Sequence, residues 1–534
     1  MQTVSSSHLQ IPAVRWDNSV YSWLEWSSRR KLLICTLAMV LPMAARLILL
    51  PRIPIPKPFV SDEFAYLLTA ETFASGRLTN PPHPMWQHFE TLHQLMQPTY
   101  ASKYPPGQAL SLAIGIKFFG HPWFGVWLVY GLFGACLCWM LLNWVPPVYA
   151  LLGTVITLIR ISILGYWMNS YWGGALAACA GCLLLGTLPR MARGPLRSKD
   201  AALAALAVAL LANTRPYEGL VLAAGAAIVL VFWRSARRYT LASLLAWRSA
   251  VPFLLVLAAV ALLDGYYNFR ITGDPLQLPY QVYFKQYQIA PPWILLPERE
   301  PPVFRHADLE NTWKEQAWEY RENKTHLRQN IQVTYSIFKF FCPTLYFFPV
   351  VVGLFVSRSP RLWAATGIYG LTWAALLLEG NKAPHYIAAS AALLPLIVVY
   401  GFRCLRAIGG VYGPLLVLTL FGLIVLEGRA SEHGYSFETR GRDAVSNRMA
   451  VLDKLKNEPG AQLILVRYSP DHVDKSDGCV YNAADIDASR VVWALDMGSA
   501  KNQELVNYYQ GSRKIWLYQP DKDPSELVPY TENP

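Results

Sequence analysis

Charge is scarce in this sequence. Only 15% of its 534 residues are Asp, Glu, Lys or Arg, whereas 53% are hydrophobic. A soluble globular protein carries about 25% charged residues, and a soluble fold of this length has no core large enough to hide so many apolar side chains. The same composition excludes an intrinsically disordered chain. A polytopic membrane protein is the class that remains.

Signatures of bound cofactors and metals are also missing. The sequence contains no Walker loop, no GxGxxG in a βαβ setting and no nucleophile elbow. Cys179 and Cys182 form a CxxC, but the motif lies in an apolar run without partner ligands. His83, His88 and His93 are spaced by five residues, which is poor geometry for a shared metal on a helix. We therefore expect neither a metal nor a cofactor.

The net charge of +12 is distributed unevenly along the chain. Cations are in excess before residue 429, whereas the remainder is slightly acidic. Cations beside apolar segments fix membrane topology, so no nucleic-acid partner is needed to explain them. Residues 1–28 are polar or aromatic rather than a cleavable signal sequence, and we expect residues 1–30 to form a cytoplasmic N-terminus.

About eleven apolar segments are candidates for spanning helices, which need about 20 residues each. They are residues 31–50, 122–143, 147–165, 170–188, 200–214, 217–233, 249–264, 334–356, 361–379, 386–402 and 411–428. If these alternate, the loops 144–146, 189–199, 234–248, 357–360 and 403–410 are cytoplasmic, and all but the first contain or border several cations. This alternation requires residues 107–120 to form a helix at the outer surface. The expected fold is mainly α, in a bacterial plasma membrane.

Three polar segments then fall on the outer side. The loops 51–121 and 265–333 belong to a transmembrane domain that spans residues 31–430. Residues 431–534 alternate strand patterns, such as AQLILVRYS and KIWLYQP, with helical ones. We expect this tail to be a small α/β domain, periplasmic or extracellular, without a catalytic centre of its own. Its role would be to recognise the acceptor or a partner.

Ionisable residues collect near the expected outer ends of the spans. They are Arg46, Arg160, Arg215 with Glu218, Asp264, and Glu379 with Lys382. A charge in lipid is costly, so such residues mark a functional site or lie at the interface. A transporter would place them near the midplane, between repeats with broken helices, and the sequence indicates neither feature. Any one of them can also be a snorkelling interfacial side chain.

The first outer loop contains an acid pair in the stretch PRIPIPKPFVSDEFAYLLTAETFASGRL. The prolines at its start cannot continue the preceding helix; Ser61 can then N-cap a new helix, and Gly76 can end it. Asp62 and Glu63 lie in the first turn, and adjacent acids on a helix point about 100° apart. Only one of them can therefore face a ligand, and we take Asp62 as the first candidate for a functional acid and Glu63 as the second. The alternative is that the acid only stabilises the helix N-terminus.

Lys103 follows in TYASKYPPGQ, where Pro105 and Pro106 fix the backbone. A cation held at the level of the lipid headgroups suits a phosphate, although an ordinary interfacial lysine remains the alternative. Arg215 lies just before Pro216 at a helix break in ANTRPYEGL, where polar backbone must line a cavity.

The order of these features resembles the GT-C glycosyltransferases. A first span, an outer loop opening with SDEFAYLLTAETFASGRL, the turn SKYPPGQ and a dense run of spans are similar to bacterial protein O-mannosyltransferases and lipid A aminoarabinose transferases, over residues 30–430. The resemblance implies an inverting enzyme that moves a sugar from a polyprenyl-phosphate donor to an outer acceptor, whether protein, lipid or glycan. It places the catalytic acid at Asp62 and the phosphate-binding lysine at Lys103. Ser102 stands where the family usually has an acid.

The residue types suit this chemistry, because a polyprenyl phosphate is a good leaving group and requires only a base and cations. The candidate phosphate ligands are Lys103, Arg215, Lys382 and His385, and the candidate contacts with sugar or acceptor are Tyr104, Tyr171 and Trp172. Aromatic residues at this level also form the interfacial belt. The alternative functions are a membrane transporter or lipid flippase, and a non-catalytic receptor or assembly protein.

Overall fold

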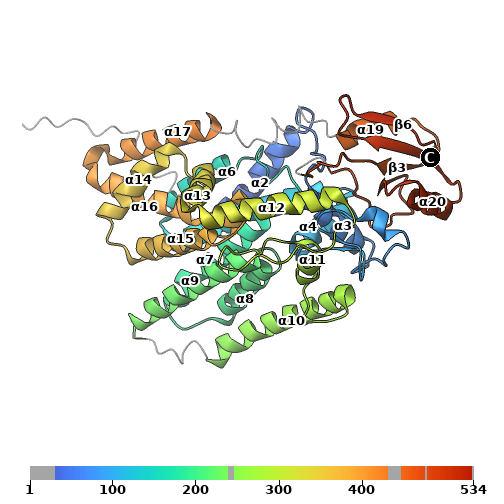
Figure 1. The fold of residues 1–534 in the computed structure, drawn as a ribbon. Helices are drawn as coiled ribbons and strands as arrows, with labels where there is room; N and C mark the ends of the chain where they lie inside the picture. The colour runs from blue at the N-terminus through green and yellow to red at the C-terminus, as the bar shows by residue number, and fades with distance from the viewer. Residues whose placement is uncertain (1–29, 239–245, 431–446, 475–477, 532–534) are drawn as a thin grey trace, which may run out of the picture.

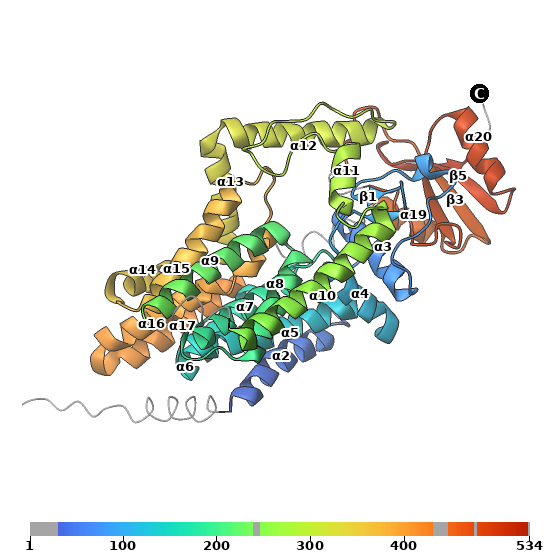
Figure 2. The same cartoon turned by 90° about the horizontal axis from the view of Figure 1, so that it is seen from below.

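The computed structural model describes residues 30–238, 246–430, 447–474 and 478–531. The expected cytoplasmic segment 1–30 therefore lies outside the described residues except for its last position, and so does the start of the tail, 431–446. Helices run side by side in a bundle, and the sheet of the tail lies beside α3 at one end of it (Figures 1 and 2).

Helices occupy each of the eleven apolar segments. They are α2 (Lys31–Ile48), α5 (Trp123–Trp144), α6 (Pro147–Arg160), α7 (Ala175–Ala192), α8 (Ser198–Ala212), α9 (Pro216–Ser235), α10 (Trp247–Thr272), α13 (Leu327–Phe341) with α14 (Phe347–Val356), α15 (Pro360–Leu377), η4 (Pro384–Ser390) with α16 (Leu393–Ile408), and α17 (Gly413–Ala430). Several of them, including α6, α9 and α15, begin with a proline. Proline suits the first turn because its missing N–H has no partner there.

The expectation of about eleven spans is only partly met. Within the described residues, six helices are long and apolar enough to cross a membrane, or up to eight if each of two bent pairs is one span. The bent pairs are α13 with η3 (Thr344–Tyr346) and α14, at 84°, and η4 with α16, at 59°. Of the others, α6 has 14 residues and α8 has 15, about 22 Å at most, which is shorter than the hydrocarbon core. The chain is a multi-pass membrane protein.

Four of the five loops that alternation assigns to the cytoplasm lie together. Hydrogen bonds join Arg193 to the carbonyl of Asn143 (3.0 Å), Arg361 to that of Trp144 (3.2 Å), Arg234 to that of Met191 (2.8 Å), and Ser198 to that of Arg248 (2.6 Å). Four interhelical loops expected in the cytoplasm thus meet at one end of the bundle.

The outer segments fold at the opposite end. The first contains α3 (Ser61–Ala74), η1 (Trp86–Phe89), the hairpin β1 (Gln94–Leu95) and β2 (Ala101–Ser102), and α4 (Pro106–Phe119); the second contains α11 (Pro279–Tyr287) and α12 (Ala307–Thr325). The helix expected over 107–120 is therefore present as α4, and it packs against α3 and α5. It ends at Gly120, whose φ of +75° suits glycine.

The tail has the expected α/β composition. Its elements are α19 (Asn447–Leu455), β3 (Ala461–Val466), β4 (Val491–Leu495), α20 (Ser499–Tyr508), β5 (Arg513–Gln519) and β6 (Glu526–Pro529). The strand order is β4-β3-β5-β6, with β3 parallel to both neighbours and β6 antiparallel to β5.

One face of this sheet shares its core with the first outer loop. Leu463 and Leu465 of β3 belong to the same hydrophobic cluster as Leu68 of α3 and Phe89 of η1. Ile464 of β3 points to the other face, where its hydrophobic cluster contains residues of the tail alone. The tail is therefore not separately packed, and it helps to fix the position of α3.

Candidate active site

Glu63 holds the start of α3 in place. Its carboxylate, 1% exposed, accepts hydrogen bonds from the backbone N–H groups of Phe59 (2.7 Å), Val60 (3.2 Å) and Tyr171 (2.9 Å). Ser61 is thus the first helical residue rather than the N-cap that we expected; Val60 occupies that position. Burial raises the pKa of Glu63 to about 7, although the three N–H donors oppose the shift. This carboxylate is buried and hydrogen-bonded to backbone groups, so it is not accessible to a ligand.

Asp62 points in another direction, as adjacent positions on a helix require. Its side chain remains 36% exposed, accepts a hydrogen bond from the Tyr104 hydroxyl, and lies 3.9 Å from Nε2 of His93. The Tyr104 ring in turn stacks on Tyr66 of α3, with 4.7 Å between ring centroids. Of the two acids, Asp62 is therefore the accessible one, and it lies beside the stacked rings of Tyr104 and Tyr66.

Lys103 lies at the end of the β1–β2 hairpin, with its N–H donating to the carbonyl of His93 (3.1 Å). Its side chain is 4% exposed, and four aromatic rings surround the Nζ atom. The distances to the ring centroids are 5.1 Å for Tyr104, 5.4 Å for Tyr280, 4.9 Å for Tyr283 and 5.7 Å for Trp313. Burial lowers the pKa of Lys103 to about 7, and the nearby charge of Asp62 partly offsets that effect. Ser102 is buried beside it and accepts a hydrogen bond from the Tyr104 N–H (3.1 Å).

His93 completes this corner of the site. Its N–H donates to the Tyr283 hydroxyl (2.8 Å), and its ring packs against Tyr104 and Trp313. Burial and the charge of Lys103 lower the pKa of His93 to about 3, so the imidazole is neutral. His83 and His88 instead contact residues of the tail. No group of three His, Cys, Asp or Glu side chains that could hold a metal occurs among the described residues.

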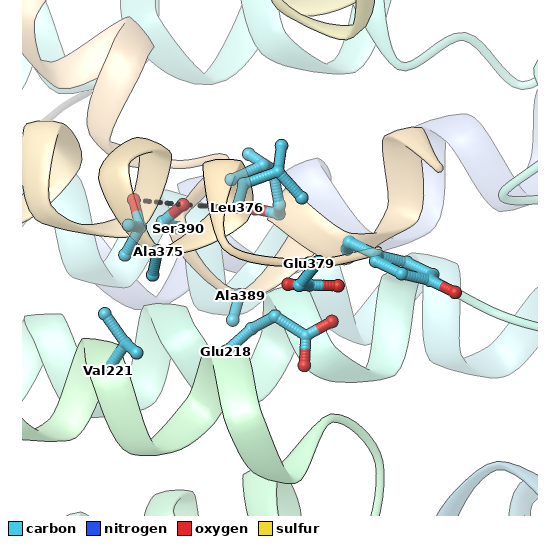
Figure 3. A pocket seen from close by; sticks show the side chains of 10 residues that line it. Glu218, Val221, Ala375, Leu376, Glu379, Ala389 and Ser390 are labelled. Carbon is cyan, nitrogen blue, oxygen red and sulfur yellow. Dashed lines mark hydrogen bonds between the residues drawn. The ribbon is translucent and has the colours of Figure 1, made fainter. Parts of the chain in front are cut away.

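A second group of charges surrounds a pocket between α9, α15 and η4. Glu218 of α9 and Glu379, which follows α15, approach one another across it (Figure 3), and the pocket has about 260 Å³ of empty space including its mouth. In the described structure, Oε1 of Glu379 and Nζ of Lys382 are buried without a hydrogen-bond partner. The guanidinium of Arg215 lies 4.7 Å from the ring centroid of Tyr386, which lines the same pocket.

The two groups are electrostatically connected. Burial raises the pKa of Tyr66 to about 12, and the charge of Arg215 opposes the shift while that of Asp62 adds to it. Tyr66 is thus within electrostatic range of both Asp62 and Arg215. Asp62 and Lys103 both contact Tyr104, whereas Arg215 contacts Tyr386.

Two of the three aromatic candidates are packed against other parts of the protein. The Tyr171 hydroxyl donates to the carbonyl of Pro56 (2.7 Å), and its ring is buried. Trp172 stacks on His385, with centroids 5.6 Å apart. These contacts favour a structural role for Tyr171 and leave Tyr104 as the aromatic candidate nearest to Asp62.

Part of the outer set of charges also has structural partners. Arg46 is fully buried and donates to Asn169 (3.0 Å) and to the carbonyl of Ile53 (2.8 Å). Asp264 accepts a hydrogen bond from Asn213 (2.9 Å). These residues join loops and spans. Of that set, Glu218 and Glu379 line the pocket, and Arg215 contacts Tyr386, which also lines it.

Apart from Tyr104, sequence reasoning did not select the side chains that surround Lys103. Tyr280 and Tyr283 are three residues apart, and this spacing places both on one face of α11. That signal is present in PYQVYFKQY, but nothing local indicates that the face meets Lys103. The same holds for Trp313 and for His93, which we had weighed only as a metal ligand.

No protein-family model and no curated protein matches the sequence. The structure is similar to two crystal structures of ArnT from Cupriavidus metallidurans, one bound to undecaprenyl phosphate and one in the apo state; each has a TM-score of 0.52 at 12% identity and covers 90% of this chain and 92% of ArnT. An oligosaccharyltransferase from Archaeoglobus fulgidus is more distant, with a TM-score of 0.40 at 10% identity, over 92% of this chain and 69% of that one. The GT-C resemblance is therefore confirmed for the fold: this chain is a multi-pass membrane protein with an ArnT-like fold.

Proposed function

We propose that this protein is an inverting glycosyltransferase that moves a sugar from a polyprenyl-phosphate donor to an acceptor on the outer side of the plasma membrane. One observation carries the proposal: an accessible carboxylate, Asp62, hydrogen-bonds to Tyr104, whose ring also contacts the Lys103 ammonium, and a second cation, Arg215, is within electrostatic range of Tyr104. The fold is similar to that of ArnT, which has been crystallised with undecaprenyl phosphate. Sugar, acceptor and prenyl length are left open.

In this proposal Asp62 is the base. It removes the proton of the acceptor hydroxyl as that oxygen attacks the anomeric carbon, and the bond from that carbon to the donor phosphate breaks. A positioned base contributes about 10²- to 10⁴-fold to the rate. The partly exposed carboxylate of Asp62 is accessible to a hydroxyl group, whereas that of Glu63 already accepts three backbone hydrogen bonds. Tyr104, bonded to Asp62, is the residue that we expect beside the sugar.

The cations stabilise the phosphate as it leaves with the bonding electrons. Neither Lys103 nor Arg215 forms an ion pair or a side-chain hydrogen bond with the described residues, so both can receive an anion. Lys382 has a buried ammonium without a partner in the same part of the structure and is the third candidate. His385, the fourth candidate, stacks on Trp172.

A lipid flippase is the second candidate, and one observation favours it. Two pairs of helices are broken, at 84° and 59°, and broken helices occur at the substrate sites of many transporters. A flippase moves the lipid intact, whereas a transferase cleaves it.

The test is chemical. Purified full-length protein in lipid nanodiscs is incubated with a panel of undecaprenyl-phosphate sugars, and the release of undecaprenyl phosphate is measured with and without membrane extract as acceptor source. We expect release with one donor, and its loss in Asp62→Asn. Lipid movement in proteoliposomes without any cleavage would favour the flippase and overturn the proposal.

A further inference from the structure

Lys103 lies in an aromatic cage, which we define as Tyr104, Tyr280, Tyr283 and Trp313. All four ring centroids are within 6 Å of Nζ, the range of cation–π attraction. Three of the four come from the second outer segment: Tyr280 and Tyr283 from α11, and Trp313 from α12. Asp62 is close enough to influence the ammonium, but the ion pairs among described residues do not include the two.

The choice of rings rather than a carboxylate has a chemical consequence. A carboxylate would use the N–H donors of the lysine, and an incoming phosphate would have to displace it. Ring faces attract the positive charge without occupying all of those donors. A buried cation in such a cage is stabilised and still able to form charge-assisted hydrogen bonds with an anion.

The cage is held rigidly. Tyr283 and Trp313 are buried at 0% and 1% exposure, and their rings are 6.0 Å apart. The Tyr283 hydroxyl also accepts the hydrogen bond from the N–H of His93, which ties α11 to the hairpin that bears Lys103. One hydrophobic cluster contains Leu95 of the hairpin, Tyr283 and Trp313. A cage fixed in this way reduces the cost of ordering the lysine on binding.

We infer that Tyr280, Tyr283 and Trp313 are positioning residues that hold Lys103 for an anionic phosphate and thereby set the affinity of the protein for its lipid donor. The inference rests on the proposed function, since it assigns the phosphate of a polyprenyl donor to Lys103. The inference adds that the second outer segment determines how tightly that phosphate is held, although the acid pair and Lys103 belong to the first outer segment.

The experiment measures the dissociation constant of undecaprenyl phosphate for full-length protein in nanodiscs, with melting temperature as a second readout. Trp313→Phe keeps a ring face and Trp313→Leu removes it. We expect Trp313→Leu to weaken binding by about 3- to 30-fold and Trp313→Phe to stay within about threefold. Leu309→Ala, a buried neighbour in the same cluster, is the packing control; it should lower the melting temperature without changing the affinity.

The outcomes are distinguishable. If Trp313→Leu binds as the wild type does while Lys103→Ala loses binding, the inference about the cage is wrong and the proposed phosphate site stands. If Lys103→Ala binds normally, the phosphate role of Lys103 itself fails. Should Trp313→Leu not fold, Tyr280→Leu against Tyr280→Phe provides the same comparison, because Tyr280 is only partly buried at the start of α11; equal affinities in that pair would overturn the inference.

Discussion

Two neighbouring carboxylates at the start of α3 have opposite surroundings. Glu63 is enclosed and accepts hydrogen bonds from three backbone N–H groups. Asp62 is partly exposed and, among the hydrogen bonds of the described structure, accepts only that of the Tyr104 hydroxyl. The helix terminus thus depends on Glu63. A substitution at Asp62 therefore tests chemistry without removing the cap, which the sequence by itself did not guarantee.

Asp62→Asn should lower transfer by about 10²- to 10⁴-fold while undecaprenyl-phosphate affinity is kept. Asparagine retains an acceptor for the Tyr104 hydroxyl but lacks the charge and basicity needed to take a proton. Initial rates and binding, measured on the same preparation, separate the two effects. Glu63→Gln is the matched control, because it replaces one acceptor oxygen by an NH₂ group that faces backbone N–H donors. We expect this variant to lose about 1–3 kcal/mol of folding stability. Full transfer activity in Asp62→Asn would end its assignment as the base.

The affinity for the phosphate should depend on pH through Lys103. Because burial lowers its pKa from 10.5 to about 7, the ammonium predominates below pH 7 and is lost above it, so affinity should fall as the pH rises from 7 to 9. Among the groups that face Lys103, His93 stays neutral, because its pKa of about 3 lies far below this range, and burial holds the tyrosine pKa values high. Asp62 is the remaining charged neighbour.

Lys103→Arg distinguishes this cause, because a guanidinium stays charged throughout the range. Its affinity profile should be flat from pH 7 to 9. Ionisation of the phosphate monoester, near pH 6, acts in the opposite direction and strengthens binding as the pH rises. A wild-type affinity that does not fall above pH 7 would contradict the role of the buried ammonium.

At the scale of elements, strand β3 contributes side chains to two hydrophobic clusters. Successive side chains of a strand point to opposite faces, so Leu463 packs with α3 and η1, whereas Ile464 packs only within the tail. Tyr481 of the tail also stacks on Phe64 of α3, with centroids 4.2 Å apart. The tail therefore supports the helix that bears Asp62, and deleting it would disturb the site whatever its role in acceptor recognition.

Leu463→Ala and Ile464→Ala form a matched pair for this point. Both residues are fully buried, so each substitution should cost about 2–5 kcal/mol. Only Leu463→Ala should increase amide hydrogen exchange in α3, residues 61–74, because only that side chain reaches the shared core. Equal exchange of α3 in the two variants would show that the tail does not support it.

At the scale of the whole molecule, the basic loops meet at one end and the candidate site lies at the other. This geometry agrees with alternating spans, and the positive-inside rule assigns the basic end to the cytoplasm. A reporter behind β6 should therefore be on the outer side, and one inserted at Arg197, between α7 and α8, should be cytoplasmic. Alkaline phosphatase and green fluorescent protein fusions check both positions. If both fusions report the same side, the alternation of the spans is wrong, and with it the assignment of the candidate site to the outer side.

The sequence by itself determined the class of protein, the places of the helices and the α/β character of the tail. These follow from local properties: apolar runs, the alternation along strands, and prolines at helix starts. It also selected Asp62 and Lys103, because an acid pair at a helix start and a lysine before two prolines are short motifs. It did not decide how many of the eleven helices are full spans, since length and bending depend on packing.

Only the tertiary structure decided which acid is free and what surrounds the lysine. Glu63 is committed because Tyr171 lies 108 residues away in sequence and donates to it, and His93 is tied to Tyr283 over 190 residues. No local pattern carries such contacts. A buried charge takes its properties from neighbours that distant segments supply, and so the partners of Lys103, Arg215 and Glu379 became visible only when the helices were packed.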